Sequence, residues 1–170
     1  MKVLKNKNMP REEKRHKIEV HVAGVCFREN FEDIEILIVK RQKNRQLYPE
    51  KWECGGGQVY AGENFEEALK RQIKEELGLI VRKPLVFGIY EINVPEQKQK
   101  KIPGIKFVCF WEKYLNGKEP QIDLREHSQW KWISINKLSE IDFIPGVEKD
   151  IMTGWEFYSE NKNILQKKIF

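Results

Sequence analysis

Short runs rich in Val, Ile, Leu and aromatic residues recur along the chain and predict β-strands. The first two runs are separated by a polar segment, Arg28–Asp33, which is expected to form a turn. Two later runs are expected to pair with each other as a long hairpin. The predicted strands are Glu19–Phe27, Ile34–Lys40, Trp52–Cys54, Leu85–Val94, Ile105–Tyr114 and Gln129–Ile133.

Apolar residues at helical spacing predict a first helix over Asn64–Leu77, and Gly78 stands where a helix-ending glycine belongs. A short helix is expected over Asn136–Glu140 and a terminal helix over Val147–Gln166. Residues Gln42–Lys51 are polar and predict a loop. Strands before and after a central helix, with a second helix at the end, predict an α/β sandwich with a mixed sheet.

The first helix carries carboxylates on its apolar side. At about 100° per residue, Phe65, Leu69 and Ile73 share one face, and Glu76 projects from the middle of that stripe. A carboxylate that faces a core is costly unless a cation meets it. Two interpretations remain open: the helix holds metal ions, or its last turn leaves the core and Glu75 simply pairs with Arg71.

Three glycines, Gly55, Gly56 and Gly57, precede this helix. Glycine tolerates positive φ and lets the backbone approach a ligand closely. Backbone N–H groups can bind phosphate, while carbonyl and carboxylate oxygens suit Mg²⁺ or Mn²⁺. Together with the inward carboxylates, the glycines predict a loop for phosphates beside a helix for metal ions.

Length and composition restrict the remaining choices. A chain of 170 residues is expected to form one domain over 18–170, preceded by a basic lead-in over 1–17. No apolar run approaches the roughly 20 residues of a membrane span, and the lead-in lacks the apolar stretch of a secretory signal. With 31 basic and 26 acidic residues the net charge is +5, which suits a charged surface or attraction of a polyanion.

The three cysteines form an odd count without metal-type spacing, which predicts reduced thiols and a cytoplasmic location. Cys26 and Cys109 lie in apolar runs and are expected in the core. Cys54 adjoins the glycines, but no histidine lies near it in sequence, so a nucleophilic role is disfavoured.

The glycines and the helix together resemble the signature of the Nudix hydrolase family. That signature is Gly, five residues, Glu, seven residues, then Arg-Glu-aliphatic-x-Glu-Glu-x-Gly-aliphatic. The matching positions are Gly57, Glu63, Arg71, Gln72, Ile73, Glu75, Glu76, Gly78 and Leu79. Every fixed position agrees except 72, where Gln replaces Glu. The resemblance extends from about Val20 to the terminal helix and implies a Nudix α/β/α sandwich.

The resemblance also implies an activity and a set of roles. The family hydrolyses nucleoside diphosphates linked to another moiety, with Mg²⁺ or Mn²⁺ as cofactor. Some members place a phosphate-binding basic residue at the strand end held by Arg41, and an extra carboxylate where Glu126 stands. The implied roles are catalytic for Arg71, Gln72, Glu76 and Glu126; metal-binding for Gly56, Gln72, Glu75 and Glu76; substrate-binding for Arg41, Gly57 and Gln58; and supporting for Glu63.

Arg41 and Glu126 also have a plain interpretation as solvated residues of charged stretches, and His127 is expected at the surface. Gln72 departs from the family, because an amide keeps the shape of Glu but loses its charge and cannot serve as a base. Base assistance is typically worth on the order of 10²–10⁴-fold. Three explanations stay open: Glu126 substitutes as the base, which is favoured; the chain is a weak or inactive nucleotide-binding module; or Gln was introduced to trap a complex.

The compact length and the segment Trp132–Gly146 resemble the MutT-like branch of the family, which cleaves nucleoside triphosphates. The oxidised-guanine enzyme of that branch uses an Asn at the position that Val147 occupies here, which argues against that specificity. RNA 5′-end processing is a further alternative, disfavoured because no RNA-binding segment is recognisable. The expected partner is a nucleotide and not a membrane, nucleic acid is disfavoured, and the expected state is a monomer or a homodimer.

Overall fold

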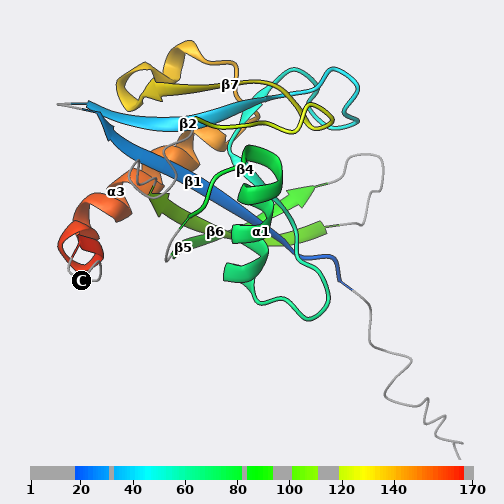
Figure 1. Cartoon of the computed structure of the whole chain (residues 1–170), viewed down its shortest axis with the longest axis horizontal. Helices are drawn as coiled ribbons and strands as arrows, with labels where there is room; N and C mark the ends of the chain where they lie inside the picture. Colours follow the sequence, from blue (N-terminus) through cyan, green and yellow to red (C-terminus); the bar gives the residue numbers. More distant parts are fainter. Residues whose placement is uncertain (1–17, 31–32, 82–83, 94–100, 111–118, 167–170) are drawn as a thin grey trace, which may run out of the picture.

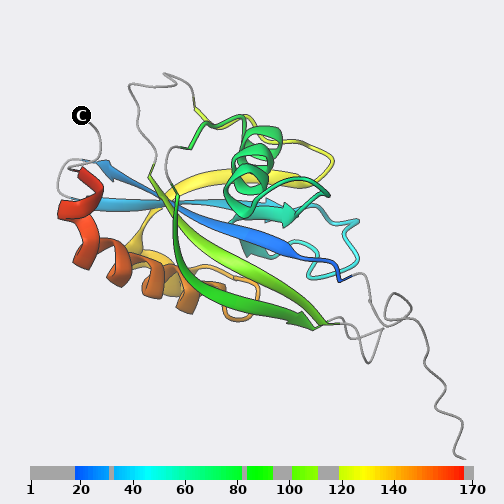
Figure 2. The same cartoon turned by 90° about the horizontal axis from the view of Figure 1, so that it is seen from below.

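The fold is a mixed β-sheet with helix α1 on one face and helix α3 on the other (Figures 1 and 2). This computed structural model describes residues 18–30, 33–81, 84–93, 101–110 and 119–166. The strands are β1 (His21–Asn30), β2 (Asp33–Arg41), β3 (Trp52–Glu53), β4 (Gly55–Gln58), β5 (Leu85–Asn93), β6 (Lys101–Phe110) and β7 (His127–Ser134). The helices are α1 (Phe65–Leu77), the 3₁₀ helix η2 (Ile135–Glu140) and α3 (Val147–Gln166).

The sheet has the order β3-β2-β1-β6-β5, with β4 paired to β1 and β7 paired to β2. β1 and β6 run parallel, whereas the other pairings are antiparallel, which confirms the predicted mixed sheet. β5 and β6 form the predicted antiparallel pair. The expected strand ends at Val94 and Tyr114, and the lead-in over 1–17, lie outside the described residues.

The first two strands extend further into the polar segment between them than the sequence predicts. β1 continues to Asn30 and β2 begins at Asp33, so the predicted turn over Arg28–Asp33 is too long. Arg28 and Glu35 are direct partners in the ladder, and Arg28 Nε donates to Glu35 Oε2 at 2.6 Å. This cross-strand ion pair lets charged residues extend the strands beyond the apolar run.

The predicted glycine loop is instead the strand β4, which pairs antiparallel with β1. Gly56 has φ of +156°, and a Cβ there would lie 2.3 Å from the Val22 carbonyl oxygen. A Cβ on Gly55 would lie 2.8 Å from Ile73 Cδ1 of α1. The glycines therefore allow one backbone segment to pack between a strand and a helix at the same time.

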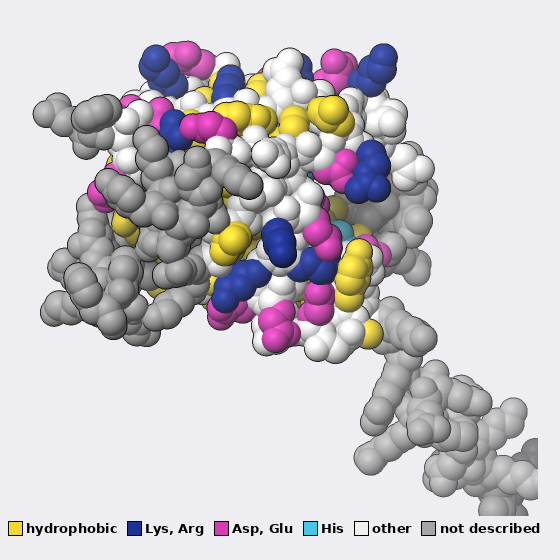
Figure 3. Space-filling view, in the orientation of Figure 1, with side chains coloured by type: hydrophobic (Ala, Val, Ile, Leu, Met, Phe, Trp, Pro, Cys, Tyr) yellow, Lys and Arg dark blue, Asp and Glu magenta, His cyan; other side chains and the backbone are white. Residues whose placement is uncertain are grey.

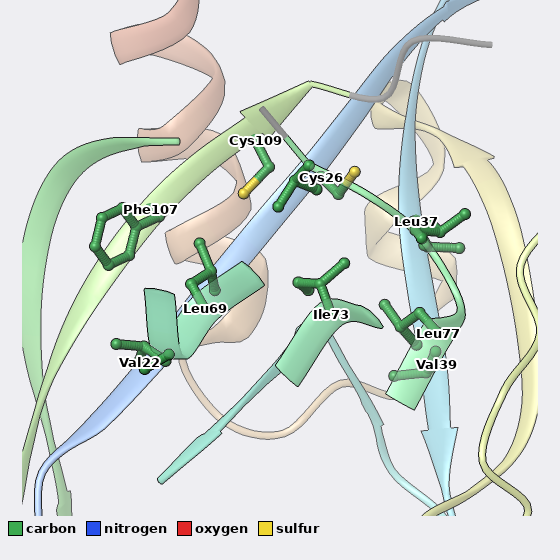
Figure 4. Close-up of a cluster of buried hydrophobic side chains, with 12 residues drawn as sticks. Val22, Cys26, Leu37, Val39, Leu69, Ile73, Leu77, Phe107 and Cys109 are labelled. Carbon is green, nitrogen blue, oxygen red and sulfur yellow. The ribbon is translucent and has the colours of Figure 1, made fainter. Parts of the chain in front are cut away.

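Two hydrophobic layers hold the helices against the sheet. The layer under α1 includes Leu69, Ile73 and Leu77, and it contains Cys26 and Cys109 as predicted (Figure 4). Burial raises the pKa of Cys26 to about 12, so this thiol stays protonated. Under α3, the rings of Phe27 and Trp155 meet edge to face with centroids 5.6 Å apart.

Both ends of α1 are fixed by hydrogen bonds. Asn64 and Glu67 form a reciprocal capping box at the first turn. Gly78 ends the helix with φ of +67°, as predicted, and its N–H donates to the Lys74 carbonyl at 3.0 Å. The N–H groups of Gln121 and Asp123 donate to the carbonyls of Leu77 and Glu76, each at 2.8 Å. These bonds fix the last turn, which carries Glu76.

Over the described residues of the face in Figure 3, Lys and Arg side chains lie beside Asp and Glu side chains. No helix in the described part of the chain is both long enough and apolar enough to cross a membrane.

Replacing Gly56 by Ala tests the packing of β4. A Cβ at Gly56 meets backbone atoms that cannot rotate away, so we expect Gly56→Ala to lower the free energy of unfolding by about 3 kcal/mol or more. Gly88→Ala is the matched control, because the nearest atom to a Cβ there is Lys106 Cδ at 3.9 Å. Chemical denaturation of the two variants checks this, and equal stability would contradict the packing described.

Candidate metal and phosphate site

The carboxylate of Glu76 lies at the centre of the candidate site. It is partly buried and accepts a hydrogen bond from the Gly56 backbone N–H, so it points toward the glycine strand as the helix pattern predicted. Burial, followed by the negative charge of Glu53, raises its pKa to about 8. The Glu126 charge also raises this pKa, whereas Arg45 lowers it. Glu76 is therefore an incompletely compensated carboxylate.

Gln72 lies over the glycine strand and is only 7% exposed. Its Nε2 donates to the Gln58 carbonyl at 3.3 Å, and a Cβ on Gly57 would lie 2.5 Å from the same nitrogen. Gly57 thus has no room for a side chain beneath Gln72. A deprotonated Glu at 72 could not donate this bond and would place a second negative charge on the helix face that carries Glu76.

The predicted ion pair between Glu63 and Arg71 is present. Arg71 Nε and Nη2 donate to the two carboxylate oxygens of Glu63 at 2.5 and 2.9 Å, and Nη2 also donates to the Gln58 carbonyl at 2.9 Å. The Tyr60 ring covers the guanidinium at 3.9 Å. The hydrogen bond from Arg71 lowers the pKa of Glu63 to about 2. Arg71 therefore ties α1 to the strand that carries Gln58.

Glu75 points differently from Glu76. Its side chain is 58% exposed and accepts a hydrogen bond from Arg71 Nη1 at 3.2 Å. The ordinary i,i+4 pair that the sequence left open is thus formed. Glu75 lies beside the site, and its role as a second metal ligand stays a prediction.

Arg41, Glu53 and His127 form a network at the base of the site. Arg41 Nη1 donates to Glu53 Oε1 at 2.7 Å, and Arg41 Nε donates to the Leu47 carbonyl at 2.9 Å. His127 Nε2 lies 3.3 Å from the same Glu53 oxygen. The predicted surface position of His127 is wrong: it is 4% exposed, because it begins β7 and pairs with the end of β2.

Glu126 lies close enough to the site to affect the charge of Glu76, and its own partner is Arg45, with Nη1 2.5 Å from Oε2. Sequence reasoning missed Glu53 and Arg45. Glu53 had a signal, because it alternates with Trp52 in β3, whose ring is buried, and so faces the other side. Arg45 had none, because its position depends on how two loops meet.

Cys54 is the remaining candidate. Burial raises the pKa of its thiol far above the usual range, and the charge of Glu53 raises it further. A thiol that stays protonated is a poor nucleophile, which agrees with the interpretation disfavoured from sequence.

The residues around Glu76 suit a hard divalent cation that arrives with phosphates. Within the described residues, no group of three His, Cys, Asp or Glu side chains is arranged to hold a metal ion. Mg²⁺ commonly uses one or two carboxylates together with substrate phosphates and water. Glu76, with the negative charges of Glu53 and Glu126 near it, supplies the carboxylate that this pattern needs, and a cation would offset the charge that raises the Glu76 pKa.

The sequence profile of the NUDIX domain matches residues 17–152. The chain belongs to the Nudix family. A Mycobacterium tuberculosis protein, whose name places it among the 8-oxo-dGTP diphosphatases, is 29% identical over 129 residues, 75% of this chain and 81% of that protein. The nucleoside triphosphatase NudI of Salmonella arizonae is 50% identical over 42 residues, 25% of this chain and 30% of that protein.

Solved structures share the fold of this Nudix chain. The NUDIX domain of Shewanella oneidensis NrtR, complexed with ADP ribose, aligns with a TM-score of 0.69 and 14% identity over 88% of this chain and 93% of that one. A MutT protein from Methanosarcina mazei aligns with a TM-score of 0.65 and 23% identity over 85% and 96%. The same NrtR, complexed with a 27mer DNA, aligns with a TM-score of 0.66 and 14% identity over 84% of this chain and 63% of that one.

In the metal-free protein, we expect the effect of Glu76→Gln on the free energy of unfolding to depend on pH. A raised pKa in the folded state means that the native carboxyl keeps its proton between about pH 4.5 and about pH 8, where the unfolded carboxyl has already lost it. The free energy of unfolding therefore falls progressively across that window and is flat above it. At pH 9 we expect Glu76→Gln to raise the free energy of unfolding by at least about 1 kcal/mol, with little effect at pH 4. Denaturant unfolding at both pH values measures this.

Glu75→Gln is the control, because its exposed carboxylate should change stability by less than about 0.5 kcal/mol at either pH. A Glu76→Gln variant that is less stable than the parent at pH 9 would show that the ionised carboxylate is well compensated.

Proposed function

We propose that this Nudix protein hydrolyses a nucleoside triphosphate or a related nucleoside diphosphate derivative to a nucleotide and phosphate or pyrophosphate. The observation that carries this proposal is the partly buried Glu76 carboxylate turned onto the backbone of Gly56. It lies within the family's signature segment, next to a glycine strand whose backbone can approach phosphates. The names of the relatives support the same class, because 8-oxo-dGTP and nucleoside triphosphates both contain phosphoanhydride bonds.

Each residue would have a defined part in the reaction. Glu76 would hold the divalent cation, with Glu75 and the Gly56 carbonyl as further ligands. Mg²⁺, or Mn²⁺ in its place, would neutralise phosphate oxygens and lower the pKa of a bound water. Gly57 and Gln58 would contact the phosphates through the backbone.

The supporting pair has a positional part. Arg71 is held by Glu63 and by the Gln58 carbonyl, so it keeps the strand and the helix in register. Arg41 is held by Glu53 through Nη1 and by the Leu47 carbonyl through Nε, so a contact with phosphate would use its remaining N–H donors.

Glu126 is the proposed general base. Gln72 cannot accept a proton from water in a useful way, and its amide is engaged with the Gln58 carbonyl. The side chain of Glu126 is 36% exposed, which leaves it accessible to water, and its charge reaches Glu76. Proton acceptance is therefore assigned to a loop residue rather than to the helix.

Val147, at the position where the related oxidised-guanine enzyme has Asn, begins α3 and packs against the hydrophobic layer under that helix. An aliphatic side chain offers no hydrogen bond to a base. Phe143 packs in the same layer, as a core residue does, and its backbone forms a parallel β-bridge with Trp52.

We also propose residues 18–170 as one functional domain, monomeric or homodimeric, in a reducing compartment such as the cytoplasm. The free thiols of Cys26, Cys54 and Cys109 support the compartment.

A second candidate is nucleotide binding without turnover. The hydrogen bond from Gln72 to Gln58 favours it, because this arrangement is satisfied without a metal ion. Restoring the signature residue separates the two candidates. If Glu126 serves as the base, the parent chain turns substrate over; if instead the enzyme lacks its base because of Gln72, Gln72→Glu should raise kcat/KM on the order of 10²–10⁴-fold. It should also lower metal-free stability, because a carboxylate replaces an amide donor at the Gln58 carbonyl.

The assay uses nucleoside triphosphates, ADP-ribose and dinucleoside polyphosphates with Mg²⁺ and with Mn²⁺, on the parent chain and on Gln72→Glu. Glu76→Gln in each background is the control and should abolish turnover. Folded protein that turns over no substrate in either background would reject the enzyme and leave the binding module.

A further inference from the structure

Arg45 and Glu126 come from two loops that meet beside the candidate site. Arg45 Nη1 lies 2.5 Å from Glu126 Oε2, and both side chains are 36% exposed. Arg45 also lines a pocket of about 300 Å³ together with Arg41, Asn44 and Gln46. The residue proposed as the base is therefore ion-paired in the free protein, and its partner Arg45 lines a pocket that a second arginine also lines.

The other two arginines of the site are fixed more firmly. Arg41 is 15% exposed and binds both Glu53 and the Leu47 carbonyl. Arg71 is 19% exposed and binds both oxygens of Glu63 as well as the Gln58 carbonyl. By contrast, Arg45 is joined to Glu126 by an exposed ion pair, and such pairs are worth little in water. It is the easiest of the three to redirect.

We propose that Arg45 exchanges partners: it pairs with Glu126 in the free protein and moves to a phosphate group of the nucleotide in the complex. This inference rests on the proposed function of Glu126. Arginine binds phosphate through two parallel charge-assisted hydrogen bonds, which favours the exchange. Once released, Glu126 takes a proton from water, the water oxygen bonds to phosphorus, and the anhydride P–O bond breaks with its electron pair on the leaving phosphate.

The exchange does not require either loop to move. The Gln42 N–H donates to the Glu126 carbonyl at 3.0 Å, and Gln42 Nε2 donates to the Leu124 carbonyl at 2.7 Å. These bonds join the two loops independently of the ion pair. Arg45 can therefore rotate away while Glu126 stays in place, and Arg45 variants should keep the loops assembled.

The exchange can be tested without hydrolysis by measuring how tightly the full chain binds inorganic tripolyphosphate, with a chelator present to remove divalent metal ions. Calorimetry compares the parent, Arg45→Ala, Glu126→Gln and the double variant. Glu126→Gln frees Arg45 and should tighten binding. Removing the negative charge of Glu126 also reduces its repulsion of the phosphates. The effect of Glu126→Gln is therefore measured in the Arg45→Ala background as well. We expect the gain to be at least about threefold larger when Arg45 is present.

Lys43→Ala is the matched control, because it removes one exposed positive charge from the same loop. We expect Arg45→Ala to weaken tripolyphosphate binding by about tenfold and Lys43→Ala by less than about twofold. With Mg²⁺ and substrate, Arg45→Ala should raise KM more than it lowers kcat, and Arg45→Lys should recover part of the loss.

Equal gains from Glu126→Gln with and without Arg45, or equal losses from Arg45→Ala and Lys43→Ala, would overturn the exchange. If Arg45 and Glu126 are coupled in tripolyphosphate binding but neither the parent nor any variant hydrolyses a substrate, only the catalytic proposal is contradicted. If substrate is hydrolysed but Arg45 and Glu126 are not coupled in tripolyphosphate binding, only the exchange is contradicted.

Discussion

The contact between α1 and the glycine strand is the constraint on which the rest of the site depends. Gly55 and Gly57 face Ile73 and Gln72 of the helix, and Gly56 faces the backbone of β1. A side chain on Gly56 would meet the backbone of β1, and one on Gly55 or Gly57 would displace the end of the Ile73 or Gln72 side chain. Because no Cβ intervenes, the last turn of α1 comes close enough for Glu76 to accept a hydrogen bond from Gly56. Packing thus places a carboxylate where solvation is poor.

That placement has an electrostatic consequence. The charges of Glu53 and Glu126 add to the burial of Glu76, and only Arg45 and one backbone N–H act against them. A divalent cation would offset this charge, and it would do so most effectively when bound phosphates complete its coordination. Gln72 lessens the conflict by replacing a carboxylate with an amide donor. Gln72 therefore avoids a second carboxylate beside Glu76, and it lacks the negative charge that the family signature has at this position.

Much of this arrangement follows from sequence. The spacing of Leu69, Ile73 and Glu76 predicts both the helix and the inward carboxylate, because helical geometry is local. Phe65, assigned to the same face from sequence, is 42% exposed. The β5–β6 pair and the Gly78 cap are also predicted, because each depends on residues that lie close together in the sequence. The glycine segment was predicted as a loop, since glycine is usually a poor strand former. Only the position of β1 and α1 on either side shows why a strand there needs glycine.

The charge network could not be predicted in the same way. His127 is buried because β7 pairs with β2, and its ladder partner Arg41 lies far from it in the sequence. Glu53 and Arg45 join the site through pairing of β3 and through two loops that meet at Gln42. None of these contacts leaves a periodic signal in the sequence, so the residues that tune Glu76 emerge only from the fold.

Paramagnetic broadening by Mn²⁺ tests the central claim most directly. Backbone amide spectra of the ¹⁵N-labelled chain, recorded with tripolyphosphate and substoichiometric Mn²⁺, report which residues lie near the ion. The account predicts that signals of Gly56, Gly57 and the last turn of α1 disappear first. Preferential loss of signals at Glu66 and Glu67, the exposed carboxylates at the other end of the helix, would contradict it.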